Sequence, residues 1–328
     1  MPPPGISRHR GALPNLIVIG AMKSGTSSLH FYLGLHPGIQ MSQPKELHFF
    51  IDAASFEPDP FVLAPGETAP LRGDGNWHRG EDWYRRFFDP SSPIRGESTV
   101  AYSFPWYPGV PERMARICPD ARLLFIVRDP VARMVSHYLA YRHAGRESRD
   151  INDVLGRPNS QYLAASRYRT ALDGFLTRYE RAQLKVVRQE DLLTRRHETL
   201  SSIFSFLGVD SNFWSEEMNT LRNTYRSKGR SLQRVERLVR TPVGRRLAQV
   251  IPTATKARAE AFLASSNASP ERPVLLETTR LAALERLEPE IRGVEELTGW
   301  NLDDWRRPSY TEDGDGPERA NSTPDHLS

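Results

Sequence analysis

LIVIGAMKSGTSS, residues 16–28, is the stretch of sequence that decides the fold. Its first four residues form a short apolar run, rich in β-branched side chains, that is typical of a buried strand, and Gly20 ends the run. A Gly/Ser/Thr loop follows, and apolar residues then recur with helical spacing over about residues 26–35, up to Pro37. In a strand, loop and helix of this kind, backbone N–H groups and the positive end of the helix dipole point at one spot. The segment therefore predicts a site for an anion.

Two more strand–helix units follow further along the chain. The apolar run LLFIV at residues 123–127 precedes Asp129, a suitable N-cap, and a helix expected over about residues 130–141. The run LKVV at residues 184–187 leads into a helix expected over about residues 191–207. Continuous apolar strands that alternate with helices indicate a parallel sheet covered on both faces. The predicted fold class is α/β: a P-loop-like, three-layer core with a central, mainly parallel sheet and flanking helices.

The length of 328 residues fits one large folded domain. We expect it to span residues 15–308 and to end with a periodic, helix-like segment at about residues 275–297. Residues 1–14 are proline-rich and basic, and residues 309–328 have no apolar cluster, so a flexible N-terminus and a disordered C-terminal tail are expected. Residues 52–80 are rich in Pro and Gly, which predicts a long surface loop.

Composition also bears on the compartment. Apolar residues make up 38% of the chain and charged residues 26%, as in a soluble globular protein. No apolar run approaches the roughly 20 residues that span a bilayer, so no transmembrane segment is expected. The first residues show no secretory signal, and the single cysteine, Cys118, cannot form an intramolecular disulfide. The expected location is cytoplasmic.

Charge is unevenly distributed, although the formal net charge is only +4. Nine arginines or lysines and one acid lie from Arg222 to Arg246, whereas fourteen acids and seven arginines lie from Glu271 to the end. The basic stretch can be a solvated helix face or can lie near an anionic ligand, and the sequence leaves both readings open. The net charge by itself does not indicate a nucleic-acid partner.

The anion loop differs from a nucleoside-triphosphate P-loop in the position of its lysine. In that motif Lys and Ser/Thr follow the second glycine, whereas here Lys23 precedes Gly25 and Thr26 follows it. The loop therefore lacks the lysine that would reach a γ-phosphate. Taken alone, it also leaves open an ordinary strand–helix turn with a surface lysine.

Three motifs together resemble those of the sulfotransferases that use 3′-phosphoadenosine-5′-phosphosulfate (PAPS) and release 3′-phosphoadenosine-5′-phosphate (PAP). They are IGAMKSGTSSL at residues 19–29, PKELHFF at residues 44–50 and LLFIVRDPVARMVSHY at residues 123–138. The resemblance covers nearly the whole folded chain and implies a single sulfotransferase domain. It also implies a set of cofactor-binding residues: Lys23, Ser24, Gly25, Thr26, Ser27 and Ser28 for the phosphosulfate, Arg128 and Ser136 for the 3′-phosphate, Tyr168, and Lys228, Gly229 and Arg230 as a covering segment.

The same resemblance assigns catalytic roles. Glu46 stands where the heparan-sulfate-like and bacterial branch has its general base, which would take the proton of the attacking acceptor. Taken alone, Glu46 also leaves open an exposed carboxylate that pairs with Lys45. Lys23 would stabilise the charge that develops on the leaving phosphate. His48 is either a catalytic helper or a core histidine, and the sequence does not decide between them.

The acceptor side shows two departures from the heparan sulfate enzymes. The resemblance places Ser98 and Tyr102 of the segment GESTVAY at the acceptor together with Glu46, and Ser98 replaces a lysine of those enzymes. The single cysteine also cannot form their disulfide-closed hairpin. Both departures favour a small-molecule, glycoside or lipid-like acceptor with a hydroxyl group over a polyanionic chain.

The predicted activity is PAPS-dependent O-sulfation by in-line attack with Glu46 as the base. No metal is implied, because the nine histidines are dispersed and no cysteine pair exists. Two alternatives stay open: a P-loop kinase for a small molecule, and a non-enzymatic basic protein that binds nucleic acid through residues 222–246. The sequence identifies neither the acceptor nor the oligomeric state.

Overall fold

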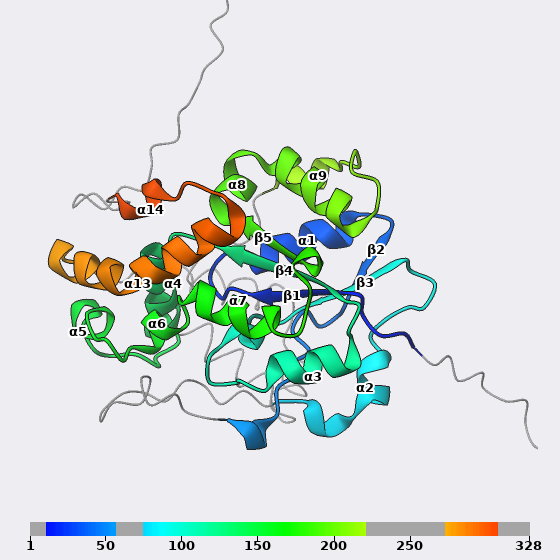
Figure 1. The fold of residues 1–328 in the computed structure, drawn as a ribbon, viewed down its shortest axis with the longest axis horizontal. Coiled ribbons are helices and arrows are strands. Elements are labelled where there is room, and N and C mark those ends of the chain that lie inside the picture. The colour runs from blue at the N-terminus through cyan, green and yellow to red at the C-terminus, as the bar shows by residue number, and fades with distance from the viewer. Residues whose placement is uncertain (1–10, 57–74, 221–272, 308–328) are drawn as a thin grey trace, which may run out of the picture.

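The structure of the chain is a computed structural model that describes residues 11–56, 75–220 and 273–307. At its centre, five parallel strands form one sheet in the order β2-β3-β1-β4-β5 (Figure 1). The strands are β1 (Leu16–Gly20), β2 (Ile39–Met41), β3 (Ile94–Ser98), β4 (Arg122–Val127) and β5 (Leu184–Arg188). The α-helices are α1 (Thr26–Leu35), α2 (Glu81–Arg85), α3 (Val110–Ile117), α4 (Pro130–His143), α5 (Ile151–Leu155), α6 (Gln161–Ala164), α7 (Tyr168–Leu176), α8 (Gln189–Thr194), α9 (Arg196–Leu207), α13 (Glu277–Thr298) and α14 (Asp303–Arg306).

Helices cover both faces of the sheet, and alternate side chains of the central strands point to opposite faces and pack against them. On one face, Leu16 and Val18 of β1 pack against helices α1, α8 and α9. On the other face, Ile17 and Ile19 lie in one buried cluster with residues of α3, α7 and α13. Figure 1 shows α1 and α9 on one side of the sheet and α3 on the other. The predicted three-layer α/β core is confirmed.

The strand order creates a topological switch point between β1 and β4. From β1 the chain passes through α1 on one face to reach β2, whereas from β4 it reaches β5 by way of α7 on the other face. Connections that leave two neighbouring parallel strands in opposite directions open a crevice at the carboxyl ends of those strands. The segments that follow Gly20 and Val127 therefore lie on either side of this crevice.

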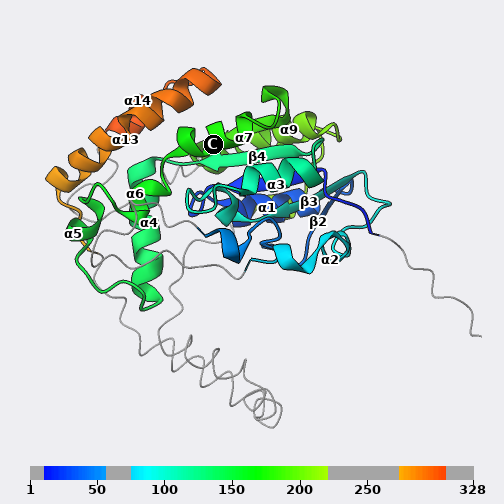
Figure 2. The ribbon, with the colours of Figure 1, turned by 60° about the horizontal axis from the view of Figure 1, so that its bottom comes forward.

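Helices α4, α5 and α6 form a group at the carboxyl end of β4, and α13 lies across them (Figure 2). Met134 and Tyr138 of α4, Val154 of α5, Tyr162 of α6 and Leu287 of α13 belong to one buried cluster. This packing fixes the position of α4 beside the crevice. Within the described ranges, no helix is long and apolar enough to cross a membrane.

The structure confirms the expected strand, loop and helix of residues 16–35, the strands β4 and β5, and the helices α4 and α13. The single helix expected over residues 191–207 is instead two helices, because the backbone of Arg195 (φ −129°, ψ 48°) is not helical. The sequence does not predict β2 and β3: β2 has three residues, and β3 has the sequence IRGES. Most of the long loop and of the two chain ends lies outside the described residues.

Candidate functional site

The loop after β1 arranges its backbone around the amino end of α1. Lys23 (φ 69°) and Gly25 (φ 96°) both adopt left-handed backbone conformations. Gly25 is the N-cap of α1, and a Cβ there would carry this unfavourable φ and lie 3.3 Å from the side-chain amide of Gln189. Among the described residues, no side chain caps α1, and its first turn contains no acid. The first backbone amides of α1 and its dipole are thus suited to an anion.

The hydroxyl groups of the loop differ in their surroundings. Ser24 Oγ is buried near Tyr168 but makes no hydrogen bond of ordinary geometry with any described residue. Thr26 Oγ1 accepts a hydrogen bond from Lys45 Nζ at 3.3 Å. Ser27 and Ser28, in the first turn of α1, are half-buried. The buried Ser24 hydroxyl is therefore the one most in need of a further partner.

Lys23, Arg128 and Arg133 bring three positive charges to the switch point. The pKa of Lys23 is lowered, first because its ammonium group is largely buried and then because Arg128 and Arg133 lie near it. Arg128 is half-buried at the end of β4, and its guanidinium makes no ion pair with a described residue, although the Glu190 carboxylate lies near it. Such a concentration of positive charge in a partly desolvated crevice is stabilised by a bound anion.

Arg133 is a member of this group that the sequence analysis did not identify. Its side chain is fully buried in α4, and it donates to the Met22 carbonyl at 3.0 Å, which ties α4 to the anion loop. It also donates to the Tyr162 carbonyl at 2.8 Å and contacts His137 Nδ1 at 2.9 Å. Burial, and the charge of Arg133 next to it, lower the pKa of His137 well below its usual range. His137 is therefore neutral, and its Nδ1 accepts the hydrogen bond from Arg133. Within the described chain no carboxylate forms an ion pair with Arg133, and its guanidinium contacts neutral groups, Ser166 Oγ among them at 3.0 Å.

The start of α4 is fixed beside this group. Asp129 is the N-cap of α4, and its Oδ1 accepts from the amides of Val131 and Ala132 at 2.9 and 3.1 Å, as the sequence predicts. Tyr168 is buried, and its hydroxyl donates to the Arg128 carbonyl at 3.0 Å. It therefore holds the backbone of Arg128. Ser136 is half-buried in the second turn of α4.

Glu46 and His48 lie on a loop that contacts the anion loop through Lys45. Lys45 Nζ lies 3.0 Å from Glu46 Oε1, in addition to its hydrogen bond with Thr26. The other oxygen of Glu46 lies 3.5 Å from His48 Nε2. The side chain of Glu46 is 31% exposed, so it can reach a molecule from solvent. The structure thus brings together the two motifs that the sequence separates by about twenty residues.

The residues predicted at the acceptor lie deeper than expected. Ser98 is fully buried, and its Oγ lies 2.9 Å from His30 Nδ1. Burial, together with the charge of Lys45, lowers the pKa of His30 to about 4, so His30 is neutral. Tyr102 is 1% exposed, and its hydroxyl is bonded to Glu97 and to loop amides, which places it beneath the Glu46 loop.

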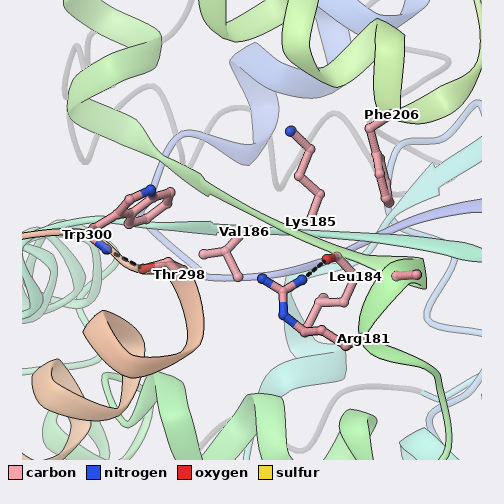
Figure 3. Close-up of a pocket in the computed structure, with 8 residues that line it drawn as sticks. Arg181, Leu184, Lys185, Val186, Phe206, Thr298 and Trp300 are labelled. Atoms are coloured by element: carbon pink, nitrogen blue, oxygen red, sulfur yellow. Dashed lines mark hydrogen bonds between the residues drawn. The ribbon is translucent and has the colours of Figure 1, made fainter.

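A cavity of about 310 Å³ lies elsewhere, beside the first residues of β5 (Figure 3). Its cationic side chains already have partners: Lys185 donates to Ser202 Oγ at 2.8 Å and Arg181 to the Leu184 carbonyl at 2.6 Å. Because the candidate site lies at the opposite, carboxyl end of the strands, this cavity is not part of it. In the described ranges no three His, Cys, Asp or Glu side chains are placed to share a metal ion.

The predicted covering residues Lys228, Gly229 and Arg230, and with them the basic stretch 222–246, lie outside the described residues. The structure therefore assembles the first and third motifs at the switch point and the second motif beside them. Lys45, His30 and Arg133 join the site through contacts between segments far apart in the sequence. Of these three residues, Arg133 alone gives a signal in the sequence, because an arginine on a largely apolar helix indicates a buried polar partner.

Comparison with known proteins identifies a family. Residues 14–216 match the model of the sulfotransferase family. The human bifunctional heparan sulfate N-deacetylase/N-sulfotransferase 2 is 28% identical over 249 residues, which is 66% of this chain and 26% of that protein. The membrane-associated sulfotransferase kil1 of Dictyostelium discoideum is 25% identical over 180 residues, which is 49% of this chain and 33% of that protein. The chain thus spans about a quarter to a third of the length of these relatives.

A solved structure extends the likeness to the fold. The sulfotransferase from Alicyclobacillus acidocaldarius superposes with a TM-score of 0.60 at 25% sequence identity, and the match covers 90% of this chain and all of the other. The match thus covers a larger share of the chain than the family model, which spans residues 14–216. Since the family model covers more than half of the 328 residues, the chain belongs to the sulfotransferase family.

Proposed function

We propose that the chain transfers a sulfuryl group from PAPS to a hydroxyl group of a small-molecule, glycoside or lipid-like acceptor, at the carboxyl ends of β1 and β4. One observation carries the proposal. Lys45 joins the anion loop to the Glu46 carboxylate, with contacts of 3.3 Å to Thr26 and 3.0 Å to Glu46. An anion site and a candidate base thus lie within the reach of one side chain, as group transfer between two bound molecules requires.

The residues of the crevice fit PAPS, which has a phosphosulfate and a separate 3′-phosphate. The loop amides, Lys23 and the hydroxyls of Ser24, Thr26, Ser27 and Ser28 would hold the phosphosulfate. Arg128 and Ser136 would hold the 3′-phosphate, with Tyr168 fixing the Arg128 backbone. The buried positive charge of Arg133, which lies near Lys23, also favours a bound anion. Lys228, Gly229 and Arg230 are proposed to cover the donor.

PAPS, when bound, supplies the sulfuryl group that is transferred. Glu46 takes the proton of the acceptor hydroxyl as its oxygen attacks, and Lys45 holds the carboxylate in place. Lys23 offsets the negative charge that grows on the leaving phosphate, a contribution that is largest in the transition state. His48, 3.5 Å from Glu46, can share or pass on the proton that Glu46 receives.

The acceptor has two candidate chemistries. A hydroxyl is the first candidate, on an acceptor that is less charged than a polyanionic glycan, because Ser98 stands where the heparan sulfate enzymes have a lysine. An amine is the second candidate, because the relatives with 25–28% identity include enzymes named as heparan sulfate N-sulfotransferases. Glu46 would serve as the base for either nucleophile.

Thermal unfolding with different ligands tests the proposal. PAP without magnesium should stabilise the protein by about 2.7 kcal/mol at a hundred times its dissociation constant. ATP with magnesium should give a smaller effect; a larger effect of ATP would favour a P-loop kinase. Binding of nucleic acid that falls steeply with salt, with no response to PAP, would favour the nucleic-acid-binding alternative.

A further inference from the structure

A carboxylate is fully buried in the middle of the sheet, directly under the Glu46 loop. Glu97 lies in the strand β3, opposite Ile17 of the central strand β1, and is 0% exposed. Three hydroxyl groups surround it: Thr99 donates to Oε2 at 2.9 Å, Tyr102 donates to Oε1 at 2.9 Å, and Tyr84 also donates to Oε1. Burying a carboxylate is costly even with such partners, and an apolar side chain would serve the core better.

The partners of Glu97 also hold the loop that carries Glu46 and His48. Thr99 Oγ1 accepts from the amides of Leu47 and His48 at 3.2 and 3.3 Å. The Tyr102 hydroxyl accepts from the amides of Phe49 and Phe50 at 3.0 and 3.4 Å. The four consecutive backbone amides of residues 47–50 thus donate hydrogen bonds to two hydroxyls. Both hydroxyls donate their single proton to the same carboxylate.

This arrangement depends on the direction of each hydrogen bond. A hydroxyl has one proton, so it can offer lone pairs to the loop amides only if its proton points elsewhere. An ionised carboxylate accepts and never donates, and it therefore turns the protons of Thr99 and Tyr102 away from the loop. A neutral acid or an amide at position 97 would donate a proton into the cluster and turn one hydroxyl round, so that its proton would face a loop amide.

The backbone of the loop shows why it needs such support. His48 has a left-handed φ of 50°, which a non-glycine residue keeps only when its surroundings fix it. Its amide is bound by Thr99, and its carbonyl accepts from the amides of Ile51 and Asn76 at 3.3 and 3.0 Å. The conformation of His48 sets the direction of the chain between Glu46 and the buried Phe49.

We infer that Glu97 is a positioning residue for the transfer reaction: through Thr99 and Tyr102 it fixes the four amides that hold Glu46 and His48 beside the anion loop. The inference rests on the proposed function for its catalytic consequence. The hydrogen bonds themselves, and the order that they give the loop, do not depend on what the enzyme transfers. Glu97 touches no substrate.

Two buried tyrosines provide a matched pair of variants. Both Tyr84 and Tyr102 donate to Glu97 Oε1, and both are at most 1% exposed. Of the two, Tyr102 alone accepts hydrogen bonds from loop amides. At a pH above the Glu97 pKa of about 7, Tyr102→Phe and Glu97→Gln should lower kcat on the order of 10- to 100-fold. Tyr84→Phe should keep kcat within about twofold of the parent, because its hydroxyl contacts no loop amide. PAP affinity should stay near the parent value in all three.

Hydrogen–deuterium exchange of the amides of residues 47–50 gives a readout that is independent of activity. We expect faster exchange there in Tyr102→Phe and Glu97→Gln, and parent-like exchange in Tyr84→Phe, although all three lose a hydrogen bond to the cluster. Equal exchange and equal kcat in the two tyrosine variants would overturn the inference and leave Glu97 with a role in stability alone. Faster exchange in Tyr102→Phe and Glu97→Gln, together with a parent protein that transfers nothing from PAPS, would instead refute the proposed function and retain the positioning of the loop.

Discussion

Replacing Arg128 by alanine separates recognition of the donor's 3′-phosphate from general attraction of anions. The Arg128 guanidinium forms no ion pair with a described residue, so its removal breaks no ion pair of the described chain. In the variant, the nearby Glu190 carboxylate should keep its other two partners, which are the Arg188 guanidinium at 3.4 Å and the amide of Asp129 at 3.0 Å. The free energy of unfolding should therefore change by no more than about 0.5 kcal/mol.

The expected loss in binding follows from one charge-assisted contact. A hydrogen bond to a charged group contributes about 1.5–3 kcal/mol, which corresponds to an increase of about 10- to 150-fold in the dissociation constant. Isothermal titration calorimetry with PAP and with adenosine 5′-monophosphate measures this difference, because the second ligand lacks the 3′-phosphate. Arg128→Ala should weaken PAP binding by that factor and leave the affinity for adenosine 5′-monophosphate almost unchanged.

Arg146→Ala serves as the control, since Arg146 is an exposed arginine beyond the end of α4. It should bind both ligands as the parent does. Unchanged PAP affinity in Arg128→Ala would remove Arg128 from the site. An equal loss for both ligands would show that Arg128 acts only as a general positive charge, and the assignment of the 3′-phosphate to it would be wrong.

Two further predictions follow from ionisation. The pKa of Lys23 is lowered by burial and by the charges of Arg128 and Arg133, and a bound phosphate should raise it again. PAP binding at alkaline pH should therefore take up protons in the parent but not in Lys23→Met. Calorimetry in buffers of different ionisation enthalpy measures this uptake, and equal uptake in both proteins would contradict the prediction. Burial raises the pKa of Glu97 to about 7 from 4.5, so the folded protein binds more protons than the unfolded chain between these values, and the free energy of unfolding should fall by about 3 kcal/mol as the pH rises through this window. Urea unfolding on both sides of the window should show this fall in the parent but not in Glu97→Gln, and an identical slope in both would place the titration elsewhere.

Parts of the fold and site that depend on local sequence could be predicted. The apolar runs of β1, β4 and β5, and the loop around Lys23, carry their signals in consecutive residues. Asp129 and the following proline mark the start of α4 in the same way. By contrast, β3 is a strand because it lies between β1 and β2, and its sequence IRGES gives no apolar pattern from which to infer this.

The contacts that complete the site join distant segments, and no spacing in the sequence reveals them. Arg133 reaches the Met22 carbonyl across 111 positions, and Tyr102 reaches the Phe49 amide across 53. The family resemblance predicts Tyr102 at the acceptor, and the structure shows that its hydroxyl bonds to Glu97 and to the amides of Phe49 and Phe50. A motif indicates which residues matter, whereas the direction of each side chain depends on how the chain packs in three dimensions.

Sulfate transfer by the parent protein and by Glu46→Gln tests the central claim most directly. Both proteins are incubated with PAPS and a set of hydroxylated and aminated compounds, and products heavier by one SO₃ group are detected by mass spectrometry. The parent should form such a product without magnesium, whereas Glu46→Gln should form it about 10²–10⁴-fold more slowly while binding PAP with parent affinity. Transfer by Glu46→Gln at the parent rate would contradict the account, because the carboxylate beside the anion loop would then not be the base.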